Sequence, residues 1–468
     1  MKYDVIVIGG GPGGYLAAER LAAEKLKVAL IEKADVGGTC LNVGCVPTKT
    51  FLNSAKLYAH AREGAAFGIE AEGAHVNWPR AVAWKDEVVS RLRRGLELTL
   101  KKGGIEILRG QGKLTGTHGV AVDTGTAEPL TLDADSIIVA TGSSPIIPPI
   151  PGVQGNPAVL DSTGMLALKE VPQRLCIIGG GVIGVEFASL FSSLGSKVTI
   201  IEMMDEIVPV MDRQMAMMLR NALKPVTFTL GAKVTSVDGH SVVYETSGGE
   251  KGAVEADVIL MSVGRKANTE GWGAKEAGLE IKNRAVATDA HQRTNLPGLW
   301  AIGDVTGKSQ LAHAAYRMAE VATADILASR RGEHSVHEFV PETVPWALFS
   351  LPEAAGVGYT EDEAKAKGYD VSVVRTPYGV SGRFIAENGF SSPGSIKIIF
   401  EKTSQRLLGV HMLGAYASEH IWGAALALER RLPLSALQNM VFPHPTVSEV
   451  IREAAWSAHQ SDAHSKGV

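Results

Sequence analysis

Cysteine is scarce in this chain, which has only three among its 468 residues: Cys40, Cys45 and Cys176. An odd and low count argues against a secreted scaffold that is held together by disulfides. Cys176 lies in an apolar run beside Ile177 and Ile178, so we interpret it as a core residue. Cys40 and Cys45 are close together along the chain, and their surroundings decide their role.

Long apolar runs and an excess of one charge are also missing. No run approaches the roughly 20 residues that a helix needs to cross a bilayer. The strand-like run that follows Met1–Asp4 is too short for a signal-peptide core. Basic and acidic residues are nearly balanced, 46 against 50, which gives a net charge of −4. We therefore expect a cytoplasmic protein, or a mature form that has lost a presequence, with no nucleic acid and no membrane among its partners.

Glycine, in contrast, is abundant, with 52 residues, and part of it belongs to a pattern that occurs twice. Each copy reads as a buried strand, a GxGxxG turn, a helix, a second apolar strand and a final glutamate. Glu32 and Glu202 end the two copies, at the same distance from the first glycine of each turn. The glycines of the two turns are Gly9, Gly11 and Gly14 in the first copy, and Gly179, Gly181 and Gly184 in the second.

This pattern is typical of dinucleotide-binding folds. The first glycine permits the tight turn, the second lets the backbone approach a pyrophosphate, and the third lets the helix pack on the strand. The helix N-terminus then faces the phosphates with unpaired N–H groups. One GxGxxG turn is a weak signal, but two in the same frame predict one site for FAD and one for a nicotinamide nucleotide. The carboxylate of Glu202 would accept a ribose 2′-hydroxyl and repel a 2′-phosphate, which favours NAD over NADP.

The two close cysteines lie in the segment Gly37–Lys49, shortly after Glu32. They can form a small disulfide ring if the backbone bends between them, and Gly44 permits such a bend. If a helix starts here, its dipole stabilises a reactive thiolate. The alternatives are a pair of small buried apolar residues and half of a metal site. Because no further Cys or His at suitable spacing occurs nearby, we expect no metal.

A second candidate pair lies near the end of the chain, where Glu449 follows His444. A carboxylate at this spacing can fix the imidazole tautomer and stabilise its protonated form, so that His444 acts as a general acid–base for thiols. The alternative is a helix cap by Thr446 or Ser448 among surface charges. The bond between His444 and Pro445 can adopt the cis form, which would fit a rigidly held imidazole.

Together these segments resemble the pyridine-nucleotide disulfide oxidoreductase family over essentially the whole chain. The motifs that carry the resemblance are, in order, GGTCLNVGCVPTK, GGGVIGVEFA, VGRKAN, WAIGDV, QLAHAA and HPTVSE. Within the family, the sequence is most similar to the members that oxidise dihydrolipoyl groups with NAD⁺. Mercuric reductases are also similar, but they would carry a C-terminal cysteine pair, which this chain lacks.

The resemblance implies an α/β fold with two Rossmann-like dinucleotide-binding domains and a C-terminal α+β dimerisation domain. A Pro/Gly-rich stretch up to residue 152 and changes of pattern near residues 263–266 and 341–345 mark the boundaries. We expect residues 1–150 and 271–343 to form the FAD-binding domain and residues 151–270 the NAD-binding domain. Residues 344–468 would form the interface of a homodimer, with a loose tail from about Ser461.

The resemblance also implies roles for individual residues. Cys40 would meet the substrate and Cys45 the flavin, and the His444–Glu449 pair would face the Cys40 of the partner chain. Lys49 and Glu186 would flank the flavin ring as a close ion pair. Further FAD contacts would come from Gly112, Thr141, Gly142, Ser143, Asp304, Gln310, Leu311, Ala312 and His313, and NAD contacts from Val234 and Gly264.

The implied reaction passes electrons from a dihydrolipoyl group to NAD⁺ through the cysteine pair and FAD. The substrate would be a lipoyl-carrying protein or free dihydrolipoamide. One alternative is another disulfide reductase of the same family; an arginine-rich thiol pocket would favour glutathione, and the sequence indicates none. The other alternative is a flavoprotein with an NADH-binding or scaffold role, against which the complete set of Cys40, Cys45, His444 and Glu449 argues.

Overall fold

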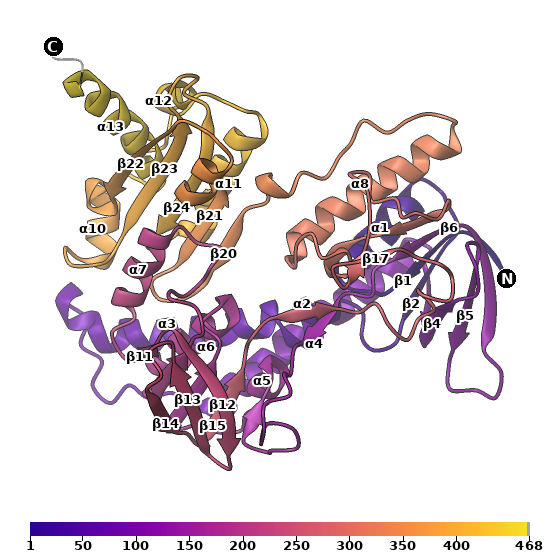
Figure 1. Cartoon of the computed structure of the whole chain (residues 1–468), viewed down its shortest axis with the longest axis horizontal. Coiled ribbons are helices and arrows are strands. Elements are labelled where there is room, and N and C mark those ends of the chain that lie inside the picture. Colours follow the sequence, from indigo (N-terminus) through magenta and orange to yellow (C-terminus); the bar gives the residue numbers. More distant parts are fainter. Residues whose placement is uncertain (466–468) are drawn as a thin grey trace. The chain divides into compact units, whose positions relative to one another are not determined.

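The computed structural model describes residues 1–465 and has the expected α/β architecture (Figure 1). Its residues form two compact units. The first combines Met1–Thr50, Val82–Ile146 and Gly264–Pro341, and the second combines Phe51–Ala81, Ile147–Val263 and the chain from Glu342 onward. The division into four segments that the sequence suggests stays a prediction.

The first unit is built on a seven-stranded sheet in the order β3-β2-β1-β6-β5-β4, with β19 paired to β6. Strands β1, β2, β3, β6 and β19 are parallel. The stretches Val5–Ile8 of β1 and Val28–Ile31 of β2 are apolar and buried, as is usual in parallel sheets. The strands are β1 (Lys2–Ile8), β2 (Val28–Glu32), β3 (Glu106–Arg109), β4 (Gln111–Leu114), β5 (Gly119–Asp123), β6 (Leu130–Val139) and β19 (Leu299–Ala301).

The parallel strands bring distant segments to one edge of this sheet. Ile8 pairs with Val139, and Val139 pairs with Ala301, so the loops that follow β1, β6 and β19 emerge side by side. Ligands of such folds bind outside the carboxyl ends of the strands. Around this edge lie α1 (Pro12–Ala23), α2 (Gly38–Val43), the start of α3 (Cys45–Glu63), β7 (Ser143–Pro145), β16 (Arg265–Ala267), the 3₁₀ turn η2 (Gly303–Thr306) and α8 (Ala312–Arg330). Most of helix α4 (Trp78–Lys102), from Val82 onward, and the small ribbon of β17 (Ile281–Lys282) and β18 (Ala285–Val286) also belong to this unit.

The second unit contains a repeat of the strand–helix–strand arrangement. A five-stranded parallel sheet has the order β11-β10-β9-β15-β8, and a three-stranded antiparallel sheet has the order β12-β13-β14. The elements are β8 (Val159–Leu160), α5 (Ser162–Leu166), β9 (Arg174–Ile178), α6 (Val182–Ser193), β10 (Lys197–Ile201), α7 (Arg213–Ala222), β11 (Val226–Thr229), β12 (Ala232–Asp238), β13 (Ser241–Thr246), β14 (Lys251–Glu255) and β15 (Val258–Met261). Cys176 lies in β9 and is fully buried, as expected of a core residue, and burial raises its thiol pKa to about 12.

The same unit ends in an antiparallel sheet with the order β20-β21-β24-β23-β22. Its core joins strand residues such as Ile398 and Val410 to helix residues such as Ala424 and Ile451. The elements are β20 (Trp346–Leu348), β21 (Ala354–Gly358), α9 (Glu361–Ala366), β22 (Val371–Pro377), α10 (Gly382–Asn388), β23 (Ser395–Glu401), β24 (Leu407–Leu413), α11 (Ala417–Glu429), α12 (Leu434–Asn439) and α13 (Glu449–Ser465).

The end of the chain differs from the loose tail that the sequence suggested. Helix α13 continues through Ser465, and only residues 466–468 lie outside the described part. Its buried residues Val450, Ile451, Ala454 and Ala455 anchor the helix on the C-terminal core, and the helix continues from there. None of the helices in the described part of the chain is both long enough and apolar enough to cross a membrane.

Candidate active site

The first glycine turn has the geometry that a pyrophosphate requires. Gly9 has φ +106°, which a residue with a side chain rarely adopts, and a Cβ at Gly14 would collide with the carbonyl oxygen of Gly9. Helix α1 begins at an N-cap glycine, Gly11, without a side-chain cap, and its first turn holds no acidic residue. The helix N-terminus can therefore offer its N–H groups to an anion.

The second turn repeats this geometry closely. Gly179 has φ +105°, and a Cβ at Gly184 would collide with the carbonyl oxygen of Gly179. The N-cap Gly181 has φ −72° and ψ −176°, against −71° and −175° at Gly11, and it also lacks a side-chain cap. Both turns thus fit a dinucleotide, which agrees with the two cofactors predicted from the repeat.

The two glutamates that end the repeats are held by the backbone. The Glu32 carboxylate accepts hydrogen bonds from the N–H groups of Gly10 (2.7 Å) and Ala34 (2.8 Å). The Glu202 carboxylate accepts from Gly180 (2.5 Å) and Met204 (2.7 Å) in the same way. Each carboxylate retains acceptor capacity for ribose hydroxyls and is already fixed beside its glycine turn.

A loop after β6 meets η2 at the edge of the first sheet. Ser143 donates from Oγ to a carboxylate oxygen of Asp304 (2.6 Å), whose pKa is raised by burial. The guanidinium of Arg265 donates to both Ser143 Oγ and the Ser143 carbonyl oxygen, each at 2.7 Å. Asn268 exchanges hydrogen bonds with Thr141, since its Nδ2 donates to the Thr141 carbonyl and its own carbonyl accepts from Thr141 Oγ1, both at 2.9 Å.

Arg265 and Asn268 were not assigned a role from the sequence. Both lie in the VGRKAN segment, and β16, which contains Arg265, pairs antiparallel with β7, which begins at Ser143. The motif could have pointed to them, but the partners only become visible once these two short strands are paired. These two side chains hold the loop that carries three expected FAD contacts.

The remaining expected contact residues are placed by their elements. Gly112 is in β4, where a Cβ would press on Ile8 and Ile31, and Gly264 has φ +112°. Gln310 donates from Nε2 to the Arg265 carbonyl (3.2 Å) just before α8. This helix has Leu311 as N-cap and begins with Ala312 and His313.

The expected contact residues of the second unit are buried. Val234 is buried in β12, and Glu186 is buried in α6 and accepts from the Phe349 N–H (3.1 Å). Lys49 is in α3 and belongs to the other unit, so its ion pair with Glu186 stays a prediction.

A disulfide joins Cys40 to Cys45, with their Cα atoms 4.6 Å apart. Cys40 is in the short helix α2, and the chain breaks at Gly44 before Cys45 begins α3. A Cβ at Gly44 would lie 2.8 Å from the carbonyl oxygen of Thr39, so glycine is needed for this approach. The pairing argues against the alternative of two separate apolar residues. As the first residue of a 19-residue helix, Cys45 is where the helix dipole stabilises a thiolate most.

His444 and Glu449 form the second chemical group. His444 Nδ1 lies 3.0 Å and 3.2 Å from the two carboxylate oxygens of Glu449. The hydrogen bond from the Thr446 N–H (2.9 Å), and then the one with His444, hold the pKa of Glu449 below its ordinary value. Because an ionised carboxylate only accepts, the ring proton of neutral His444 resides on Nδ1, which leaves Nε2 as the basic atom.

The setting of this pair suits proton exchange with a substrate. The His444 side chain is 81% exposed, whereas Glu449 is buried at the start of α13. The bond between His444 and Pro445 is cis, the form that we considered from the sequence. The Thr446 and Ser448 hydroxyls do not act as simple helix caps. Thr446 Oγ1 donates to the Pro443 carbonyl and lies beside Ser448 Oγ, so the imidazole is held by Glu449.

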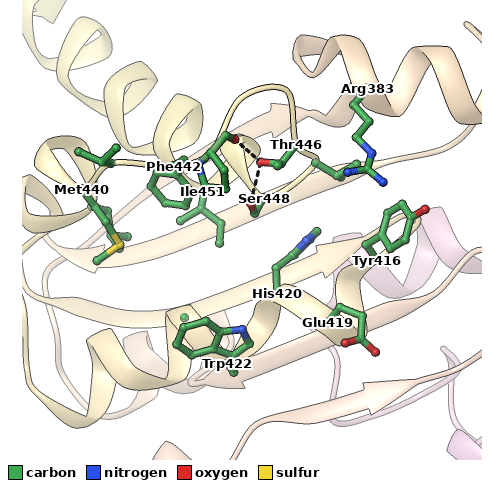
Figure 2. A pocket seen from close by; sticks show the side chains of 15 residues that line it. Arg383, Tyr416, Glu419, His420, Trp422, Met440, Phe442, Thr446, Ser448 and Ile451 are labelled. Atoms are coloured by element: carbon green, nitrogen blue, oxygen red, sulfur yellow. Dashed lines mark hydrogen bonds between the residues drawn. The ribbon is translucent and has the colours of Figure 1, made fainter.

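A groove of about 490 Å³ lies beside this loop. Figure 2 shows Arg383 and Tyr416 at one end and Met440 and Phe442 at the other. Its apolar side is continuous with side chains that are unusually open to solvent, among them Trp422 (66% exposed) and Val441 (92%). Large apolar side chains this exposed mark an interaction surface.

Comparisons with known proteins agree with this geometry. Residues 3–319 match the family described as pyridine nucleotide-disulphide oxidoreductase, and residues 344–455 match its dimerisation domain. The chain is 40% identical to the dihydrolipoyl dehydrogenase of Chlamydia muridarum, over 99% of this chain and 98% of that protein. It is 39% identical to the enzyme of the same name from Thermus scotoductus, over 99% and 98%.

Solved structures include a similar fold with a different name. A copper(II) complex of RclA from Escherichia coli, an HOCl-induced flavoprotein disulfide reductase, superposes with a TM-score of 0.85. The two sequences are 32% identical, over 98% of this chain and 99% of RclA. With its paired glycine turns, its redox disulfide and its matching dimerisation domain, this chain belongs to the pyridine nucleotide-disulphide oxidoreductase family.

Proposed function

We propose that the protein is a dihydrolipoamide dehydrogenase, which oxidises dihydrolipoyl groups with NAD⁺. FAD and NAD(H) are the cofactors of the family, and both glycine turns fit a dinucleotide. The observation that carries the proposal is the His444–Glu449 pair, which supplies the proton acceptor that a dithiol substrate needs. The names of the relatives that are 39% to 40% identical over nearly the full chain support the same activity.

The proposed chemistry starts at His444. Nε2 takes the proton of one substrate thiol, and the resulting thiolate attacks Cys40 Sγ. The Cys40–Cys45 bond breaks, and Cys45 leaves as a thiolate stabilised by the N-terminus of α3. The second substrate thiol then attacks the mixed disulfide and its proton passes to Cys40, which leaves as a thiol while the substrate is released as a disulfide. A bound FAD would supply the acceptor for the electron pair left on the two cysteines, and a bound NAD⁺ would supply the final hydride acceptor.

The cofactor and subunit assignments are part of the proposal. Residues 1–150 and 271–343 would bind FAD, with Lys49 and Glu186 beside the flavin, and residues 151–270 would bind NAD. Residues 344–468 would form a homodimer in which the groove beside His444 receives the second copy. A lipoyl-carrying protein would be the partner, in the cytoplasm.

The test is a steady-state assay of the purified holoprotein with dihydrolipoamide and with reduced glutathione, each with NAD⁺ and with NADP⁺. We expect NADH formation from dihydrolipoamide, and a loss of roughly 100-fold or more in kcat for His444→Ala, in line with removal of a general base. Buried His411, which bonds to the Tyr359 carbonyl (3.2 Å), provides a histidine variant outside the proposed site as a control. Faster turnover of glutathione than of dihydrolipoamide would overturn the proposal.

The similarity to RclA favours a second candidate, an NADH-driven disulfide reductase. Thiol–disulfide exchange is reversible, so the same cysteine pair can run in the reducing direction. The assay therefore includes NADH with lipoamide and with oxidised glutathione. A rate for some other disulfide that exceeds both lipoamide reduction and dihydrolipoamide oxidation would identify this second function.

A further inference from the structure

Thr446 stands between His444 and Glu449, and its polar groups all have partners. Its N–H donates to Glu449 Oε2 at 2.9 Å. Its Oγ1 donates to the Pro443 carbonyl at 2.8 Å and lies 2.9 Å from Ser448 Oγ, contacts that are dashed in Figure 2. Thr446 therefore connects the turn that holds the imidazole to the carboxylate that orients it.

The carbonyl of Thr446 is held from outside the loop. Ser381 donates from Oγ to this carbonyl oxygen at 3.1 Å, although the two residues are 65 positions apart. Ser381 is buried, and the same Oγ accepts from the Phe384 N–H at 3.3 Å, which caps α10. One hydroxyl thus ties the start of α10 to the loop of the proton acceptor.

We propose that Ser381 is a positioning residue for the His444–Glu449 pair and acts on it through Thr446. The inference rests on the proposed function, because it assumes that this pair takes the substrate proton. Residues 440–448 contain neither helix nor strand, so local hydrogen bonds must fix their backbone. The Thr446 carbonyl and the Thr446 N–H belong to the two peptide units that meet at its Cα. Without the Ser381 hydroxyl the carbonyl is no longer held, so both units can turn about this Cα and the N–H that orients Glu449 is held less firmly.

The expected effect is specific to the thiol half-reaction. Ser381→Ala should lower kcat for dihydrolipoamide roughly tenfold, the effect of about one lost buried hydrogen bond, with KM nearly unchanged. The NADH-dependent reduction of ferricyanide should stay at the wild-type rate, since this acceptor takes electrons from the flavin and needs no proton acceptor for thiols. A damaged fold would lower both activities.

Matched variants separate this role from a general loss of packing. Ser381→Thr keeps the hydroxyl and should restore most of the rate. Ser395 is also buried and donates to a backbone carbonyl, that of Thr376 at 3.4 Å, but it has no link to the loop, so Ser395→Ala should behave as wild type. If Ser381→Ala does not fold, Ser381→Cys carries the test, because a thiol is a weaker donor of similar size.

Three outcomes would overturn the inference. A Ser381→Ala rate within twofold of wild type would show that Thr446 holds the pair alone. Equal losses with dihydrolipoamide and ferricyanide, without rescue by Ser381→Thr, would show a purely structural role. If the wild type itself fails to oxidise dihydrolipoamide, the proposed function fails, and the positioning role fails with it.

Discussion

At the scale of single residues, the acids of the two nucleotide turns are oriented before any ligand arrives. Each carboxylate oxygen of Glu202 accepts one backbone hydrogen bond, from the N–H of Gly180 or of Met204. Its negative charge is therefore held beside the second glycine turn, and under the proposed NAD assignment it would repel a 2′-phosphate. A mobile surface acid could turn away from such a phosphate, whereas this one cannot do so without leaving two N–H groups unpaired.

We predict that NAD⁺ is preferred over NADP⁺ by at least about 100-fold in kcat/KM, because two like charges in contact cost several kcal/mol near a protein surface. Glu202→Gln should narrow this ratio by roughly tenfold, since the amide removes the charge and keeps one acceptor oxygen. Steady-state kinetics with both nucleotides measures the ratio.

The control for this prediction is an acid close in sequence. Asp205 is exposed and pairs with Arg213 at 2.7 Å. Asp205→Asn lowers the net negative charge equally and should leave the nucleotide ratio unchanged. Similar rates with NAD⁺ and NADP⁺ in the wild type would contradict the assignment.

At the scale of helices and strands, a buried lysine joins two parts of the second unit. Lys397 in β23 is only 2% exposed and lies 2.9 Å from Asp212, the N-cap of α7, and 2.7 Å from Glu361, the first residue of α9. Hydrogen bonds from Lys365 and Lys397 hold the pKa of Glu361 below its ordinary value. The pair with Asp212 is buried on both sides, so its charges have little contact with water.

Lys397→Met should lower the free energy of unfolding by about 3–5 kcal/mol, because it leaves two carboxylates without their buried partner. Lys365→Met is the matched control: this exposed lysine also binds Glu361, and its loss should lower the stability far less, because water screens the pair. Urea unfolding of both variants at pH 7 measures the difference.

The pH dependence has a definite sign. Since the folded-state pKa of Glu361 is depressed, its contribution to stability is present above its ordinary pKa and is lost as the pH falls through the depressed value. The wild type should therefore lose stability on acidification, and Lys397→Met should lose less. Equal pH slopes for both proteins would argue against this network.

Sequence reasoning reached the elements with strong local signals. The glycine turns predicted from the repeated GxGxxG pattern both form, with nearly the same geometry. The Cys40–Cys45 and His444–Glu449 pairs were also predictable, because each is close in sequence.

Partners far apart in sequence could not be found in this way. Lys397 lies in the strand Ser395–Glu401, and from the sequence a lysine there is expected at the surface. Its buried partner Asp212 is 185 positions away, so the sequence gives no sign of the pair. Ser381 and Asn268 are ordinary polar residues whose roles depend on a carbonyl supplied by another segment. Hydropathy and spacing carry no information about such tertiary contacts.

At the scale of the whole molecule, the proposed active site needs two chains. A monomer would then hold its cysteine pair without a proton acceptor. Cys45→Ser and His444→Ala proteins, each inactive, should regain activity when they are dissociated, mixed and reassociated. In a heterodimer one site combines both defects and the other combines neither, so activity should reach about half of the wild-type value per dimer, since the two sites should act independently.

Mass spectrometry of the mixed dimers under native conditions provides the control for subunit exchange. Mixing either variant with itself should restore nothing. If heterodimers form and remain inactive, each chain builds its own complete site, and the interface has a structural role only.

The near-identity of the two glycine turns bears on which residues decide the choice between FAD and NAD. Their N-cap glycines differ by one degree in φ and in ψ, so the phosphate cradle itself cannot tell one dinucleotide from the other. Selectivity must then come from the residues around each turn, such as the Thr141–Ser143 loop, which Arg265 and Asn268 hold near the first turn. The fold therefore contains the same phosphate-binding turn twice. A change of cofactor preference would require substitutions around a turn and not in the turn itself.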